Sequence, residues 1–405
     1  MRILFLSRWY PYPSDNGSKI RIINLLRGLA EHHQVSLLSF YDPASEPDKD
    51  ALRAICQDIR TVPWKPFQPD SRKSRLGFFS PVPRAYLDMY SKDMEERIHA
   101  TIKANKIDLV IASQTDMASY SDSFEGIPAV FEEVEVGIWL DRIAEAQSVT
   151  GRLRNTLTWI KHRRYLAHLM QNFRVCTVVS EKERQILRQA VPEGTNIEVI
   201  PNCVDLDNYN GITETPQRET LIFTGSLTYQ PNYDAMCWFL QEVFPQVRER
   251  CPGAQLLITG DHAGLPLPQV GGVTLTGLLP DVRPYIARAW CSVVPLLTGG
   301  GTRLKILEAM ALNTPVITTS KGAEGLEIEP GKHVLVADDA QVFSESIVQL
   351  FSQPELRQQL VSDAGQLVQT RYNCKIVMGR YLSMIEQTGQ GESSIGKQSM
   401  DTERV

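Results

Sequence analysis

Short apolar runs alternate with amphipathic stretches along nearly the whole chain, and this alternation occurs twice. Helical patterns such as those at residues 19–31 and 94–103 separate the runs of the first half. Strands are predicted at 3–7, 35–40, 109–112, 129–132, 175–180 and 197–200, then at 221–225, 255–260, 273–276, 291–295, 315–319 and 334–337. Such alternation is typical of βαβ units and parallel sheets. The sequence therefore predicts an α/β fold of two Rossmann-like domains, which we expect to face each other across a cleft.

The boundary between the two domains is expected within residues 201–218, where Pro, Asn, Gly, Thr and Gln gather without apolar periodicity. We place the domains at 1–205 and 206–375, followed by a helix at 376–388 that crosses back to the N-terminal domain. Residues 389–405 are rich in Gly, Ser, Gln and charge. Their apolar content is too low for packing, so this tail is predicted to be disordered.

The composition is that of a soluble globular protein. Of 405 residues, 42% are hydrophobic and 22% charged, and the formal net charge of −5 argues against a nucleic-acid partner. No run of eighteen apolar residues occurs, and the short run at 3–7 resembles a buried strand more than a signal sequence. We therefore expect a cytoplasmic protein, or one peripheral to the inner face of the membrane.

Cysteine usage indicates neither a disulfide framework nor a zinc site. The seven cysteines include no Cys-x-x-Cys pair and no neighbouring histidine pattern. Most are expected to be small buried apolar residues in a reducing compartment.

Residues 297–311 combine a glycine-rich turn, two cations and a carboxylate with the start of an amphipathic helix. Backbone N–H groups at a helix N-terminus favour phosphate, and glycines let it approach closely. Arg303 and Lys305 would add positive charge, and Glu308 would accept hydrogen bonds from a ribose. The segment is thus a candidate nucleoside-diphosphate site. An ordinary loop before a core helix fits the apolar spacing equally well.

Other glycine-bearing loops follow predicted strands, which is where ligands bind in open parallel sheets. In the second half four such loops would meet on one rim, and main-chain groups around 278–281 are expected to read a base. These loops supply Gly225, Ser226, Gly260, Leu278, Leu279, Asp281, Gly300, Gly301 and Thr302. In the first half, the loop at 11–19 carries Gly17 and enters a helix.

With these motifs, the chain resembles a retaining glycosyltransferase of family 4, which has the GT-B fold of two Rossmann-like domains. The resemblance extends to about Gln387 and rests on Gly17 and on residues 178–183 (VVSEKE), 200–205 (IPNCVD) and 307–317 (LEAMALNTPVI). The chain is similar to a branch of this family that carries a Gly-Gly-Gly-Thr-Arg-Leu-Lys donor loop. The resemblance implies transfer of a sugar from a UDP- or GDP-linked donor to a hydroxyl acceptor without cofactor or metal. The implied setting is polysaccharide, glycolipid or other glycoconjugate biosynthesis.

The same resemblance implies roles for the two domains. The N-terminal domain would bind the acceptor, with Lys19 and Arg21 as contacts, and the C-terminal domain together with Gly17 would bind the donor. Catalytic contributions are expected from Arg303, Lys305, Glu308, Glu133 and Glu135. The leaving diphosphate would help deprotonate the acceptor, so the cations would stabilise the charge growing on it. For Glu133 and Glu135, a solvated acidic strand end is an equally good interpretation.

Several positions depart from the family pattern. Gly300 replaces the first of two glutamates that are separated by seven residues, so the donor sugar would be contacted through backbone N–H groups. Ser226 and residues 230–232 stand where Arg and Lys usually follow the first C-domain strand. Arg303 and Lys305 are therefore expected to supply the missing charge. Cys203 replaces a glycine between the domains, and the family's N-domain histidine is not evident.

Residues 150–174 are locally basic in an acidic protein. This segment contains no acidic residue but includes Arg152, Arg154, Lys161, Arg163, Arg164 and Arg174. With interleaved apolar residues, it could bring a helix to an anionic membrane that carries a lipid-linked acceptor. A solvated helix beside the cleft is the alternative.

Two other classes of function fit parts of the sequence. Asp205 and Asp207 have the spacing of a metal-bridging carboxylate pair, which would suit a metal-dependent nucleotidyl or sugar transferase. Gly300, in place of a glutamate, would suit a non-catalytic sugar-nucleotide-binding partner of another enzyme. A nicotinamide dehydrogenase is disfavoured, because no Gly-x-Gly-x-x-Gly follows either first strand.

Overall fold

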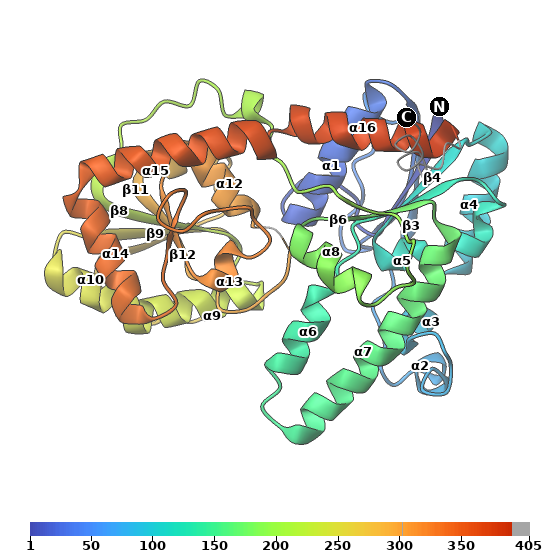
Figure 1. Cartoon of the computed structure of the whole chain (residues 1–405), viewed down its shortest axis with the longest axis horizontal. Helices are drawn as coiled ribbons and strands as arrows, with labels where there is room; N and C mark the ends of the chain where they lie inside the picture. Colours follow the sequence, from blue (N-terminus) through green and yellow to red (C-terminus); the bar gives the residue numbers. More distant parts are fainter. Residues whose placement is uncertain (302, 391–405) are drawn as a thin grey trace, which may run out of the picture. The chain divides into compact units, whose positions relative to one another are not determined.

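A computed structural model describes residues 1–301 and 303–390 of the chain. It divides into two compact units (Figure 1). Unit 1 comprises Met1–Ile200 together with the chain from Met378 onward, and unit 2 comprises Pro201–Val377. The predicted tail lies outside the described residues, except that Gly389 and Gln390 belong to the last helix, α16 (Cys374–Gln390).

Unit 1 contains a seven-stranded parallel sheet in the order β3-β2-β1-β4-β5-β6-β7. Its strands are β1 (Arg2–Ser7), β2 (Gln34–Tyr41), β3 (Asp58–Pro63), β4 (Leu109–Ser113), β5 (Ala129–Glu132), β6 (Val175–Val178) and β7 (Ile197–Val199). The aliphatic runs of β1 and β4 are almost wholly buried, as expected for strands that are covered on both faces. The sequence prediction missed β3, an edge strand with mostly half-buried residues and weak alternation.

Helices and short turns connect the strands of unit 1. They are α1 (Gly17–Ala30), η1 (Asp50–Leu52), α2 (Arg72–Leu76), α3 (Arg84–Met89), α4 (Lys92–Asn105), α5 (Gln114–Ala118), η2 (Ser121–Phe124), α6 (Gly137–Ala144), α7 (Val149–Leu169), η3 (Met170–Asn172) and α8 (Glu181–Arg188). Figure 1 shows α6 and α7 projecting away from the sheet. From Met378 onward α16 packs on α1, where a Cβ at Gly28 would collide with the Met378 side chain.

Unit 2 contains a six-stranded parallel sheet in the order β10-β9-β8-β11-β12-β13. Its strands are β8 (Gln217–Thr224), β9 (Gln255–Thr259), β10 (Val273–Gly277), β11 (Ala289–Val294), β12 (Val316–Thr318) and β13 (Leu335–Val336). Its helices and turns are η4 (Leu206–Asn208), α9 (Gln230–Trp238), η5 (Phe239–Val243), α10 (Phe244–Arg250), α11 (Arg283–Arg288), α12 (Leu304–Ala311), α13 (Ser320–Ala323), α14 (Ala340–Ser352), α15 (Pro354–Leu367) and η6 (Val368–Tyr372). Figure 1 shows these helices on both faces of the sheet.

Each sheet has a point where the strand order reverses. In unit 1 it lies between β1 and β4, and in unit 2 between β8 and β11. In such sheets ligands bind beyond the carboxyl ends of the strands at this switch point. The two parallel sheets confirm the predicted α/β class with two Rossmann-like domains.

The expectation of cysteines without a disulfide is wrong for one pair. Cys203 and Cys374 form a disulfide with their Cα atoms 4.9 Å apart. Beside it Val204 bridges Asn373, because the Val204 N–H donates to Tyr372 O and the Cys374 N–H donates to Val204 O. The two cysteines are 171 residues apart, so no local spacing could have indicated the bond.

Candidate functional site

The glycine-rich loop of unit 2 leads from β11 into α12, on the switch-point side of the sheet. Gly299 and Gly301 have φ values of 102° and 76°, which favour glycine. A Cβ at Gly299 would lie 3.1 Å from the Tyr229 hydroxyl and 3.3 Å from Pro231. The turn therefore needs glycine for its backbone conformation and for its contact with the loop after β8. Thr302 lies outside the described residues.

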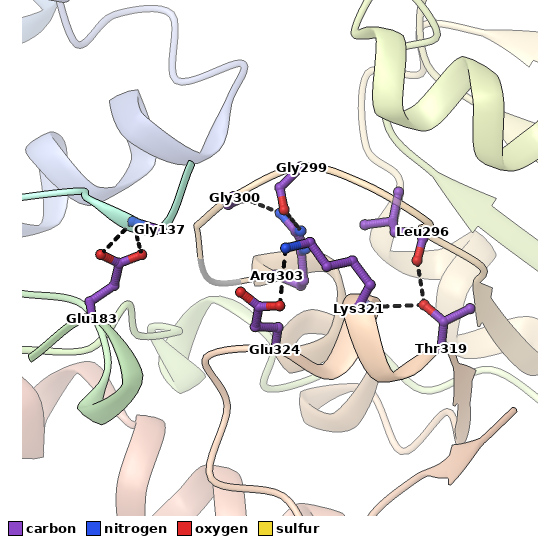
Figure 2. Close-up of polar contacts among 10 residues, drawn as sticks. Gly137, Glu183, Leu296, Gly299, Gly300, Arg303, Thr319, Lys321 and Glu324 are labelled. Atoms are coloured by element: carbon purple, nitrogen blue, oxygen red, sulfur yellow. Dashed lines mark hydrogen bonds and ion pairs between the residues drawn. The ribbon is translucent and has the colours of Figure 1, made fainter. Parts of the chain in front are cut away.

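Arg303 stabilises this loop from within. Its guanidinium is buried and donates hydrogen bonds to the carbonyls of Gly299, at 2.7 Å, and Gly300 (Figure 2). Such charge-assisted bonds to carbonyl oxygens are stronger than neutral ones. The predicted phosphate ligand thus fixes the shape of the turn, a contact that the sequence did not indicate.

Lys305 extends from α12 to the end of β8. Its Nζ donates to Asn232 Oδ1 at 2.9 Å and lies 4.3 Å from the centre of the Phe223 ring. The Asn232 amide in turn donates to Ser226 O at 2.8 Å. A Cβ at Gly225 would come within 2.9 Å of Nζ, so the ammonium lies directly beside the glycine loop. Burial, followed by the charge of Arg303, lowers the pKa of Lys305 to about 7.

Lys305 brings a cation to the loop after β8, where the usual Arg and Lys are missing. The sequence has Ser226 and residues 230–232 there instead of Arg and Lys, and Lys305 reaches the same loop from α12. Asn232, which the sequence analysis noted only as a departure, is the link between the ammonium and the loop.

The four predicted rim loops of unit 2 are in contact. Gly260 has a φ of 113°, and a Cβ there would lie 2.6 Å from the Gly225 carbonyl carbon. The Gly260 N–H also donates to Gly277 O at 2.9 Å. Together with Gly299 against Pro231, these contacts join the loops after β8, β9, β10 and β11. Glycines at these positions let the backbones approach closely.

Glu308 is half-buried on α12, one turn after Lys305. The Tyr209 hydroxyl donates a hydrogen bond to Glu308 Oε1 at 3.0 Å. Burial raises the pKa of Glu308, whereas Tyr209 and Lys305 act in the opposite direction. Tyr209 was not predicted from the sequence, because the two residues are 99 positions apart.

In the loop after β10, Asp281 is engaged by its neighbour. Arg283 donates to both Asp281 carboxylate oxygens, each at 2.8 Å, and lowers the pKa of Asp281. A further Arg283 nitrogen donates to Asn208 O. Leu278 is exposed and Leu279 half-buried. The main chain before Asp281 is thus the part of this loop that is available to a base.

The loop after β12 borders the same region. The Thr319 hydroxyl donates to Leu296 O, just before the glycine-rich turn. Lys321 forms an ion pair with Glu324 at 3.0 Å, and Figure 2 shows this pair next to Arg303. These residues were not predicted from the sequence, although Gly322 and Gly325 follow a predicted strand as the other rim glycines do.

In unit 1 the predicted residue Arg21 forms a buried ion pair. The Arg21 guanidinium contacts Glu132 at 2.7 Å, and the Ser113 hydroxyl donates to Glu132 at 2.9 Å. Arg21, predicted as an acceptor contact, thus points into the interior, where it neutralises a fully buried carboxylate. Lys19 lies at the start of α1 and pairs with Asp15 at 2.9 Å, and Gly17 is the first residue of α1, after the cap Asn16.

Glu133 lies beyond β5 in a left-handed conformation, with a φ of 59°. It is buried and accepts a hydrogen bond from the Gln114 amide at 3.1 Å. Burial, followed by the neighbouring Glu132 carboxylate, raises the pKa of Glu133 to about 8. Glu135 is half-buried. The interpretation of Glu133 as a solvated strand end does not fit this burial.

Glu183, in the motif at 178–183, stabilises the start of α6. Its carboxylate accepts hydrogen bonds from the N–H groups of Val136, at 2.8 Å, and Gly137, at 3.1 Å (Figure 2). An anion is favourable at a helix N-terminus, where N–H groups lack partners. This motif residue therefore orders the segment that follows Glu135.

Two family models match the chain. The model described as Glycosyltransferase Family 4 matches residues 15–208, and the one described as Glycosyl transferases group 1 matches residues 218–353. These matches support a glycosyltransferase of the family 4/group 1 type. A protein from Klebsiella pneumoniae described as an uncharacterized 44.6 kDa protein in the cps region is 22% identical over 400 residues. That match covers 93% of this chain and 97% of the Klebsiella protein.

Solved structures share the fold. Sucrose-phosphate synthase from Thermosynechococcus elongatus superposes with a TM-score of 0.68 at 16% identity, covering 97% of this chain and 100% of that chain. Anabaena HepE in complex with UDP-glucose gives a TM-score of 0.67 at 14% identity, covering 96% of this chain and 100% of that chain. These similarities confirm the GT-B fold.

Proposed function

We propose that the chain is a retaining glycosyltransferase that moves a sugar from a nucleoside-diphosphate sugar to a hydroxyl acceptor, without a metal ion or cofactor. The observation that carries the proposal is the switch point of unit 2. There Lys305 lies beside Gly225, the rim loops are in contact, and Glu308 stands one helical turn away. The cation and the closely approaching glycine backbones suit the diphosphate, and the carboxylate suits the ribose.

The similar proteins support a UDP-linked donor and a role in glycoconjugate biosynthesis. HepE has been crystallised with UDP and with UDP-glucose, which favours a UDP-linked donor over a GDP-linked one. The Klebsiella relative lies in a cps region, which supports a role in polysaccharide or other glycoconjugate biosynthesis.

In the proposed reaction, the leaving diphosphate helps to deprotonate the acceptor hydroxyl. The chain then needs to stabilise negative charge rather than supply a strong base. Lys305 provides a point charge, and Arg303 holds the glycine turn from which backbone N–H groups would stabilise the developing anion. Glu133 and Glu135 orient the acceptor, with Lys19 as a contact. Arg21 acts through Glu132 by holding the end of β5 in place.

The test is calorimetric titration with UDP, GDP, ADP and their common sugar conjugates in the presence of EDTA. We expect one nucleotide to bind in the presence of EDTA. Glu308→Ala should weaken that binding at least tenfold, because the ribose contact is lost. NMR of the product should show a retained anomeric configuration. Absence of binding for every nucleotide would refute the donor site, and an inverted product would refute the retaining mechanism.

The same titration, combined with an assay of sugar transfer with and without EDTA, separates the alternatives. Donor binding without turnover on any hydroxyl acceptor would favour the non-catalytic partner, which Gly300 suggests. A metal-dependent enzyme would lose activity in EDTA. Asp205 and Asp207 are engaged elsewhere, since Asp205 caps η4 and Asp207 pairs with Lys375 at 2.8 Å. Among the described residues, no group of three or more potential metal ligands occurs.

We further propose that the acceptor is lipid-linked and that unit 1 binds the cytoplasmic face of an anionic membrane. Four exposed apolar residues recur along α7, namely Val149, Leu153, Leu157 and Ile160. The exposed cations Arg152, Arg154, Arg163 and Arg164 flank them. This combination suits a helix that lies on a lipid surface. In residues 1–301 and 303–390, no helix has the length and apolarity needed to span a bilayer.

A second segment extends this surface. After α2 come Phe78 and Phe79, which are 64% and 93% exposed, and Leu76 is 71% exposed. The Lys161 ammonium on α7 donates to Gly77 O at 2.5 Å, so the two segments lie side by side. Exposed aromatic side chains of this kind are costly in water and favourable in a lipid interface.

Co-sedimentation with phosphatidylcholine vesicles, with and without phosphatidylglycerol, tests the membrane proposal. The wild type should sediment only with the anionic vesicles, and both Leu76→Ser/Phe79→Ser and Arg163→Glu/Arg164→Glu should abolish sedimentation. Lys332→Glu, an exposed charge reversal in unit 2, is the matched control. A wild type that stays in solution with the anionic vesicles would refute the proposal.

A further inference from the structure

The first residues of unit 2, just after the chain leaves unit 1, contact other parts of unit 2 at several points. Cys203 is bonded to Cys374, and Asp207 pairs with Lys375. At the far end of this stretch Tyr209 reaches Glu308, 3.0 Å away. We refer to residues 203–209 as the connector. It is fixed at its start, middle and end to parts of unit 2.

Two contacts of the connector involve the residues proposed to bind the ribose and the base of the nucleotide. Tyr209 donates to Glu308, the proposed ribose ligand, and Asn208 accepts from Arg283, which holds Asp281 beside the proposed base loop. Resting on the proposed function, we propose that Tyr209 is a positioning residue that sets the Glu308 carboxylate for the ribose hydroxyls. Arg283 anchors the connector from its other side.

The chemistry of the pair supports this role. Without Tyr209, the half-buried Glu308 carboxylate could rotate freely about its last bond, because side-chain torsions to carboxylates are broad. One hydrogen bond to Oε1 fixes the plane of the group and leaves Oε2 for a ribose hydroxyl. A hydroxyl donor also favours the ionised carboxylate, which is the form that accepts hydrogen bonds.

Isothermal titration of UDP and GDP, each compared with its 2′-deoxy counterpart, tests the inference in the full chain. Tyr209→Phe should weaken ribonucleotide binding about tenfold, which corresponds to the loss of one charge-assisted hydrogen bond. It should weaken binding of the deoxynucleotide much less. In the Glu308→Ala background, Tyr209→Phe should have no further effect. Tyr285→Phe, an exposed tyrosine of α11, should change neither affinity.

A second readout is the pH profile of binding. Loss of the Tyr209 hydroxyl removes a hydrogen bond that lowers the pKa of Glu308, so the acid limb of ribonucleotide binding should move to higher pH. Equal weakening of ribo- and deoxynucleotide, or additive effects of Tyr209→Phe and Glu308→Ala, would overturn the role of Tyr209 while leaving the donor site intact. A wild type that binds neither UDP nor GDP would instead refute the proposed function itself.

Discussion

The low pKa of Lys305 predicts that donor binding takes up a proton. Burial and Arg303 lower this pKa from 10.5 to about 7 in the unliganded chain. A pyrophosphate beside Nζ would restore the charged form, because opposite charges favour ionisation. Uptake on binding should then be about half a proton at pH 7 and about nine tenths at pH 8. Affinity should fall about tenfold per pH unit above pH 7.

Calorimetry in paired buffers of different ionisation enthalpy measures this uptake directly. A nucleotide sugar is the right ligand, because its esterified phosphates do not titrate near neutral pH. Lys305→Arg should keep binding but remove the uptake, since a guanidinium stays charged at every pH used. Lys332→Arg, an exposed lysine paired with Glu329, should leave the uptake unchanged. No uptake by the wild type at pH 8, or full uptake by Lys305→Arg, would refute the reasoning.

Three further predictions concern other parts of the chain. Arg303→Ala should lower kcat by about two orders of magnitude and raise the donor KM only a few-fold, because the turn serves the developing anion; equal changes in steady-state assays would contradict this. Since the pKa of Glu133 is raised to about 8, its stabilising contribution is complete below pH 4.5 and is lost as the pH rises through 8. Glu133→Gln should therefore have a higher melting temperature than the wild type at pH 9 and the same melting temperature at pH 4. The exposed control Glu145→Gln should match the wild type at both pH values. Identical melting curves for Glu133→Gln and the wild type at pH 9 would contradict the buried acid. Reduction of the Cys203–Cys374 disulfide should destabilise unit 2 by about 2 to 5 kcal/mol, seen as a lower melting midpoint in the wild type but not in Cys203→Ser; a midpoint insensitive to reductant would contradict it.

Much of the fold could be predicted because its signals are local. Short apolar runs that alternate with helical patterns predicted twelve strands that the structure contains, and β3 was missed because this half-buried edge strand with charged residues lacks such a run. The candidate site divides in the same way. Glycine positions and the residues of α12 could be found from one short segment of sequence.

The partners of those residues could not be found in this way. The link from Lys305 to Asn232 spans 73 residues, and that from Tyr209 to Glu308 spans 99. Arg21 illustrates the limit most clearly. The family resemblance implied that it contacts the acceptor, whereas its side chain is buried against Glu132, 111 residues away. Contacts of this kind depend on which strands become neighbours, and that is a property of the complete sheet.

The disulfide joins the points where the chain enters and leaves unit 2. Residues 201–377 are thus an insertion within the sequence of unit 1, and their two ends meet where the Cys203 and Cys374 Cα atoms are 4.9 Å apart. Inserted domains with adjacent ends can be exchanged or circularly permuted with little disturbance to their host. Under the proposed function, unit 2 could therefore be exchanged as a single gene segment, so a change of donor would not require a change in unit 1, the proposed acceptor half.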